Sequence, residues 1–190
     1  TKVVERGSAD GIFINTAGIG QLEHDIFISP KNAAEGDAIV INGRIGDHGI
    51  AVMSKREGIE FESDIVSDSA SLNRLVESIL QAVPSVHLLR DPTRGGVAAT
   101  LNEIAEAADV GIEIEESQIP IDPQVVAVSD MLGLDPLYIA NEGKMMVFVP
   151  ANEAEHVVTE MRKYPEGAEA AIIGSVTAEH PKRVVMRTRI

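Results

Sequence analysis

No cysteine occurs in the sequence, so this chain can contribute no disulfide, no thiolate ligand for zinc and no cysteine nucleophile. Tryptophan is absent and aromatic residues make up only 3%, so aliphatic side chains and methionine must fill the core. No apolar stretch approaches the roughly 18 residues needed to cross a bilayer, and the first residues lack a signal-peptide core. We therefore expect no membrane association and a cytoplasmic location.

Positive charge is also scarce. Lysine and arginine number 16 against 30 aspartates and glutamates, for a formal net charge of -14. Such a surface repels the phosphates of nucleic acids, and no basic run interrupts it, so we expect no nucleic-acid partner. The acidity does not exclude a small phosphate ligand, because a local group of backbone amides can bind one.

The pattern of apolar residues predicts the fold class. With 190 residues and 44% hydrophobic content, the chain can form a domain with its own core. Apolar runs predict strands at 11–20, 38–41, 86–89, 111–115, 137–140, 145–149, 171–176 and 183–186. Helices are predicted from 47, over 72–83, 98–108 and 123–132, and after an N-cap at Asn152. The irregular alternation favours an α/β (α+β) sandwich, with a mixed or antiparallel sheet packed against helices.

The segment Asp91-Pro92-Thr93-Arg94-Gly95-Gly96 carries the strongest chemical signal. It lies between a predicted strand and a predicted helix, where free backbone amides and the helix dipole favour an anion. Paired glycines allow a close backbone approach, Arg94 could grip a phosphate, and Asp91 could hold Mg²⁺. The alternative is an ordinary strand-to-helix turn with Thr93 as the N-cap.

Three further residues are weaker candidates on their own. Glu142 stands in the turn Asn141-Glu142-Gly143-Lys144 between two apolar runs, which suits a general base and equally suits a plain hairpin turn. His48 follows Asp47, so it is either an oriented acid–base group or simply a residue at a helix start. Lys2, beside Thr1, has little to distinguish it from any exposed lysine.

Several segments, taken in order, carry a specific resemblance: 1–4, 13–20, 36–37, 46–49, 91–98 and 140–144. Together they resemble the HypE family of hydrogenase maturation factors, the carbamoyl dehydratases. That family belongs to the PurM-like superfamily of aminoimidazole ribonucleotide (AIR) synthetase, selenophosphate synthetase and thiamine monophosphate kinase. The DPTRGG sequence at 91–96 and the NEGK sequence at 141–144 separate HypE from these relatives.

The resemblance implies a domain organisation. Residues 1–30 would be the last part of an N-terminal ATP-binding domain, and residues 31–190 would form the PurM-like C-terminal domain. Most of the Mg²⁺–ATP ligands and a homodimer interface would precede Thr1, and a tail with a reactive cysteine would follow Ile190. We expect the 190-residue chain alone to be inactive.

The resemblance also implies an activity. HypE takes a carbamoyl group from HypF on its C-terminal cysteine, dehydrates it with ATP to a thiocyanate, and passes cyanide to iron on HypC–HypD for [NiFe] hydrogenase. Carried over by position, Glu142 would be the base and Lys2 would balance charge at the reacting group. Asp91 would bind Mg²⁺, and the nucleotide loop would be formed by Thr93, Arg94, Gly95 and Gly96, with Asn141 and His48 nearby.

Two other interpretations stay open. The chain could belong to another PurM-like phosphoryl-transfer enzyme whose substrate is a selenide or an amidine. It could also act as a docking domain for HypF or HypC–HypD without catalysis of its own.

Overall fold

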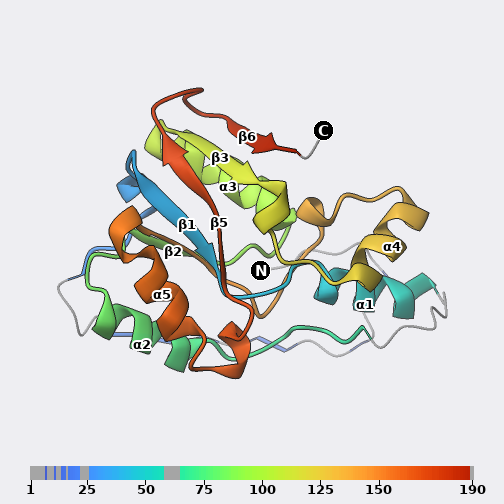
Figure 1. Ribbon diagram of the computed structural model, residues 1–190. Coiled ribbons are helices and arrows are strands. Elements are labelled where there is room, and N and C mark those ends of the chain that lie inside the picture. The colour runs from blue at the N-terminus through green and yellow to red at the C-terminus, as the bar shows by residue number, and fades with distance from the viewer. Residues whose placement is uncertain are drawn as a thin grey trace.

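The computed structural model describes residues 26–57 and 65–188, together with 7, 11, 14, 15 and 17–21. Six strands form one sheet in the order β2-β4-β1-β5-β3-β6 (Figure 1). The strands are β1 (Asp37–Ile41), β2 (Leu88–Arg90), β3 (Gly111–Glu115), β4 (Met146–Pro150), β5 (Ala171–Thr177) and β6 (Val184–Arg187). Every pairing is antiparallel except that of β3 with β6, so the predicted mixed sheet is confirmed.

Helices cover both faces of this sheet. They are α1 (Asp47–Glu57), α2 (Asn73–Ala82), α3 (Gly96–Ala108), α4 (Pro123–Leu132) and α5 (Ala154–Met161). Helix α3 packs on one face, and α2 with α5 packs on the other (Figure 1). Helices α1 and α4 contact each other beside the sheet, where a smaller apolar cluster forms around Ile50 and Val125.

The double covering explains why β1 is apolar almost throughout. Ile39 and Ile41 belong to the core beneath α3, whereas Ala38 and Val40 belong to the core beneath α2 and α5. A strand buried on both faces has no solvent side, so it has no polar alternation. Each of the fully buried side chains of Ile39, Val40 and Ile41 contributes about 2 kcal/mol of hydrophobic free energy.

Two of the predicted helices and strands differ in local detail from the structure. The strand expected at 137–140 is instead a short 3-10 helix, Pro136–Tyr138, whose N-cap Asp135 accepts a hydrogen bond from the Leu137 N–H at 2.9 Å. Proline at the first helical position favours this turn, because its φ is already fixed near the helical value. Helix α5 starts at Ala154 after another 3-10 turn, with Glu153 rather than Asn152 at its N-cap.

The N-terminal predictions are tested only in small part. Within the strand expected at 11–20, the described residues lie in no strand, and Ile14 and Ile19 are exposed. The domain boundary near residue 30 stays a prediction. In the part of the chain described, no helix is both long and apolar enough to span a membrane.

Candidate active site

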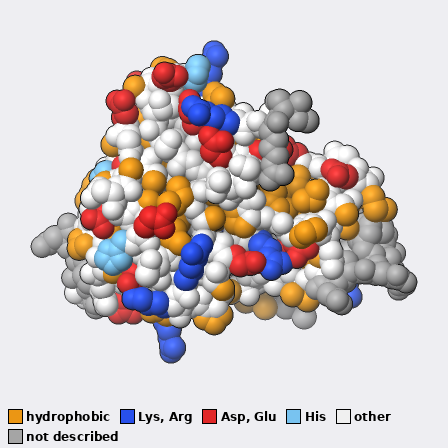
Figure 2. Space-filling model, viewed as in Figure 1, with side chains coloured by type: hydrophobic (Ala, Val, Ile, Leu, Met, Phe, Trp, Pro, Cys, Tyr) orange, Lys and Arg blue, Asp and Glu red, His pale blue; other side chains and the backbone are white. Residues whose placement is uncertain are grey.

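A cleft of about 550 Å³ gathers residues that lie far apart in the sequence. The predicted site residues His48, Thr93, Arg94 and Glu142 all line it. They come from α1, from the loop between β2 and α3, and from the segment that leads into β4. The rest of the wall is mainly apolar, formed by Val52, Met53, Leu134, Tyr138 and Ile139 together with Gly49, Asp135 and Ala140. Val126 and Met131 on α4 are also exposed hydrophobic side chains. Figure 2 shows acidic and basic side chains interspersed on the face it views.

The loop from 91 to 96 needs its two glycines for different reasons. Gly95 is the N-cap of α3 and has φ 75°, a left-handed conformation that favours glycine. Gly96 has φ 62°, and a Cβ there would lie 2.4 Å from the Leu137 carbonyl oxygen. The loop therefore packs directly against the segment that carries Glu142.

Thr93 and Arg94 face the cleft, but Thr93 is not the helix cap that the sequence suggested. Gly95 takes the N-cap position, and no side chain caps the helix. The Thr93 carbonyl instead accepts a hydrogen bond from the Gly96 N–H at 3.1 Å. The Thr93 side chain therefore does not cap the helix. Arg94 is exposed and lines the cleft.

Asn141 holds the three walls of the cleft together. It is buried, and its Nδ2 donates to the carbonyls of Pro92 at 3.0 Å and Ile139 at 3.1 Å. Its Oδ1 accepts from the Gly46 N–H, just before α1, at 2.8 Å. Both ends of the amide are thus used within the protein, which suits a residue that fixes the site rather than one that faces a ligand.

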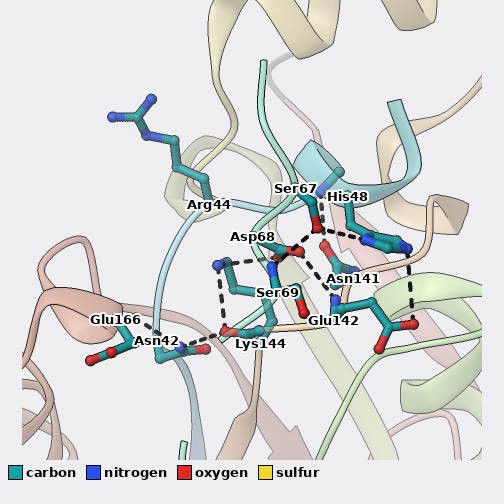
Figure 3. A network of polar contacts seen from close by, with 12 residues as sticks. Asn42, Arg44, His48, Ser67, Asp68, Ser69, Asn141, Glu142, Lys144 and Glu166 are labelled. Atoms are coloured by element: carbon teal, nitrogen blue, oxygen red, sulfur yellow. Dashed lines mark hydrogen bonds and ion pairs between the residues drawn. The ribbon is translucent and has the colours of Figure 1, made fainter. Parts of the chain in front are cut away.

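The His48 ring and the Glu142 carboxylate lie next to each other, and both residues line the cleft (Figure 3). The distance from Glu142 Oε1 to His48 Nε2 is 3.9 Å. The other ring nitrogen, Nδ1, lies 2.8 Å from the Ser67 hydroxyl oxygen. His48 therefore lies between a carboxylate and a hydroxyl, with one ring nitrogen toward each.

The turn that carries Glu142 is anchored by Asp68 (Figure 3). Asp68 Oδ1 accepts a hydrogen bond from the Glu142 N–H at 3.2 Å. Its Oδ2 makes no hydrogen bond but lies 3.2 Å from Lys144 Nζ, in an ion pair that is almost fully buried. A Cβ at Gly143 would lie 1.8 Å from the Asp68 carbonyl oxygen, so only glycine fits between the two segments.

Sequence reasoning missed both Ser67 and Asp68. They are separated from Glu142 by more than 70 residues, and each is an ordinary polar residue in a loop. No motif or spacing marks them, and only the tertiary fold brings them to His48 and Glu142. The NEGK turn is also not the hairpin that the sequence suggested, because a 3-10 turn rather than a strand precedes it.

Two predicted site residues, Asp91 and Lys2, are not among the described residues that line the cleft. Asp91 is exposed and its carboxylate lies 3.3 Å from Arg90 Nη1. A lone carboxylate fits as one ligand of a magnesium–nucleotide complex, since phosphates and water supply the others. Among the described residues, three potential metal ligands come together at Glu113, Glu179 and His180, and none of these lines the cleft. Lys2 lies outside the described residues.

Asp47, beside His48, makes stability depend on pH. Burial raises the pKa of the Asp47 carboxyl above its ordinary 3.8; Lys144 opposes this effect and Asp68 adds to it. A raised folded-state pKa contributes stability that is complete below 3.8 and is lost as pH rises through the folded value. Asp47→Asn cannot ionise, so its unfolding free energy relative to wild type should rise between about pH 4 and pH 7.

Urea denaturation of both proteins across this pH range measures the difference. The raised pKa of Asp47 would be contradicted if the unfolding free energy of Asp47→Asn relative to wild type did not change with pH, or fell as pH rises.

Comparison with known sequences agrees with these features. Residues 34–187 match the family described as AIR synthase related protein, C-terminal domain. The chain is 53% identical over 189 residues to carbamoyl dehydratase HypE of Rhizobium leguminosarum bv. viciae, covering 99% of this chain and 54% of that protein. It is 43% identical over 176 residues to the Escherichia coli K12 enzyme of the same name, covering 93% and 52%. The chain thus spans about half the length of the relatives it matches.

Solved structures give the same result. A crystal structure of HypE in complex with ATP superposes with a TM-score of 0.82 at 45% identity, over 85% of this chain and 50% of that one. HypE in a HypE–HypF complex gives 0.82 at 43% identity, over 85% and 52%. Thiamine monophosphate kinase of Aquifex aeolicus gives 0.61 at 18% identity, over 84% and 52%, which shows the shared fold alone. The predicted resemblance and the PurM-like fold are confirmed.

Proposed function

Because this chain belongs to the family of AIR synthase-related proteins, whose C-terminal domain it matches, we propose that the full-length protein is an ATP-dependent carbamoyl dehydratase of the HypE type. It would convert a cysteine thiocarboxamide into a thiocyanate and so supply cyanide ligands for the iron of [NiFe] hydrogenase. The cysteine must come from outside these 190 residues, which contain none.

One observation carries the proposal. The cleft joins a carboxylate, Glu142, to the Thr93–Arg94 loop at the start of a helix. A dehydration driven by ATP needs both parts, because a phosphoryl group must be held and a proton must be removed at the same place. The relative that was solved with ATP shares this fold.

The chemistry assigns a role to each part. An amide oxygen is a poor leaving group, and phosphorylation by ATP makes it a good one. Arg94 would hold phosphate oxygens, aided by the Gly95 amide at the helix start, since the Gly96 N–H already donates to the Thr93 carbonyl. Glu142 would take a proton from the amide nitrogen. Magnesium, when bound through Asp91, would neutralise phosphate charge. Lys2 would balance charge near the transferred group.

The partners follow from the same proposal. HypF would deliver the carbamoyl group, since a relative has been solved in a HypE–HypF complex. HypC–HypD would accept the cyano group, and the full-length protein would act as a cytoplasmic homodimer.

Replacing Arg94 by glutamine should weaken ATP–Mg²⁺ binding by about 10- to 100-fold. The reason is that a charge-assisted hydrogen bond to phosphate is worth about 1.5–3 kcal/mol. Titration calorimetry of the full-length protein measures this effect. Arg187→Gln is the matched control, since Arg187 pairs with Glu113 and Glu115 at the edge of the sheet. Equal affinities in the two variants would remove Arg94 from the nucleotide site.

The substrate is tested by ATP turnover. The full-length protein should release ADP with a carbamoylated C-terminal cysteine and not with selenide or an amidine. Turnover with either of the latter would instead indicate another phosphoryl-transfer enzyme of the superfamily.

A further inference from the structure

The proposed reaction removes more protons than one carboxylate can hold. As the carboxamide becomes a nitrile, two N–H bonds and the C–O bond break, and a carbon–nitrogen triple bond forms. The oxygen leaves on phosphate, which takes one proton, and the other proton goes to solvent. Glu142 can hold only one proton at a time, so the first must leave Glu142 before the second is taken.

Within the described residues, His48 is placed to receive that proton. Its Nε2 lies 3.9 Å from Glu142 Oε1, and both residues line the cleft. This separation is longer than a hydrogen bond, and proton transfer requires contact near 3 Å or one bridging water. The Glu142 side chain is 38% exposed, so it has room to turn toward the ring.

Ser67 orients the ring for this purpose. Its hydroxyl oxygen lies 2.8 Å from His48 Nδ1 and also accepts a hydrogen bond from the Ser69 N–H at 3.2 Å. In the tautomer with the proton on Nδ1, His48 donates to Ser67 and turns the lone pair of Nε2 toward Glu142. The same hydrogen bond persists after Nε2 is protonated, and the Glu142 carboxylate then stabilises the imidazolium.

We propose that His48, held by Ser67, accepts the proton that Glu142 removes from the amide nitrogen and so returns Glu142 to its ionised form between the two deprotonations. This inference rests on the proposed function. It assigns His48 a relay role and Ser67 a positioning role, and it leaves phosphate binding to the loop at 93–96.

Chemical rescue separates a relay from a structural role. In the carbamoylated full-length protein, His48→Ala should slow ATP-dependent dehydration by about 10- to 100-fold while leaving the affinity for ATP unchanged. Added imidazole can enter the space vacated by the ring and should restore part of the rate. Ser67→Ala should slow the reaction by about threefold to tenfold, and Ser67→Thr, which keeps the hydroxyl, should recover most of the rate.

His156→Ala is the matched control, because His156 lies half-exposed on α5 and contacts Glu153 and Glu160 rather than the cleft. Its rate should equal that of wild type and should not respond to imidazole. Dehydration at the wild-type rate in His48→Ala would overturn the relay, as would a slow variant that imidazole does not rescue. Either of these results, with a wild type that dehydrates the carboxamide, overturns the relay alone. A wild type that does not dehydrate the carboxamide overturns the proposed function as well.

Discussion

Glu142→Gln should reduce ATP-dependent dehydration by the full-length protein by about 100- to 10,000-fold, the range that a general base contributes. Glutamine keeps the shape of the side chain but cannot take a proton at neutral pH. The backbone of the turn should stay in place, because the Glu142 N–H is held by Asp68 and not by the lost carboxylate. Transfer of the carbamoyl group to the protein should therefore proceed normally. Quenched single-turnover kinetics, following the thiocyanate by mass, measure the effect.

Glu106→Gln provides the control for the loss of a carboxylate. Glu106 is exposed on α3 and does not line the cleft. We expect it to dehydrate at the wild-type rate. If Glu142→Gln retained more than about a tenth of the wild-type rate, Glu142 would not be the base.

Gly96→Ala should lower the free energy of unfolding by about 3 kcal/mol or more. The added Cβ would lie 2.4 Å from the Leu137 carbonyl oxygen and 2.6 Å from that of Ile139. Both obstacles are backbone atoms, which cannot rotate away as a flexible side chain could. The loop at 93–96 would have to separate from the segment leading to Glu142, so ATP binding should weaken as well.

Gly133→Ala is the control for the backbone strain, so the difference between the two variants gives the cost of the steric clash at Gly96. Gly133 also has a left-handed backbone, with φ 67°, but a Cβ there would meet nothing within 4 Å. Gly133→Ala should lower the free energy of unfolding only through backbone strain, by about 1 kcal/mol. Chemical denaturation of both variants gives the comparison. Similar losses at the two positions would show that the loop and the 137–139 segment are not packed as described.

The elements with one strong local signal could be predicted from the sequence. The run Ala38–Ile41 is apolar because both faces of β1 are buried, and α4 begins at Pro123 and ends before Gly133, as its cap residues indicate. The strand predicted at 137–140 was wrong, because a short apolar run can also form a 3-10 turn. In this turn Leu137 and Ile139 are buried, as they would be on one face of a strand.

The site was predictable only where a motif marks it. DPTRGG and NEGK gave the loop and the carboxylate, and the fold brings Arg94 and Glu142 to one cleft. The supporting residues could not be predicted. Asp68 acts through a backbone N–H and a buried ion pair, and those contacts depend on how two distant segments pack. The internal role of the Asn141 amide was equally hidden, because its sequence context suits a ligand contact just as well.

The most direct measurement is the intact mass of the carbamoylated full-length protein before and after incubation with ATP–Mg²⁺. A carbamoyl dehydratase should lose the mass of one water molecule from its C-terminal cysteine, with one ADP and one phosphate released for each molecule converted. An unchanged protein mass while ATP is consumed, or a gain of mass from a retained phosphoryl group, would contradict the assignment of this cleft to dehydration.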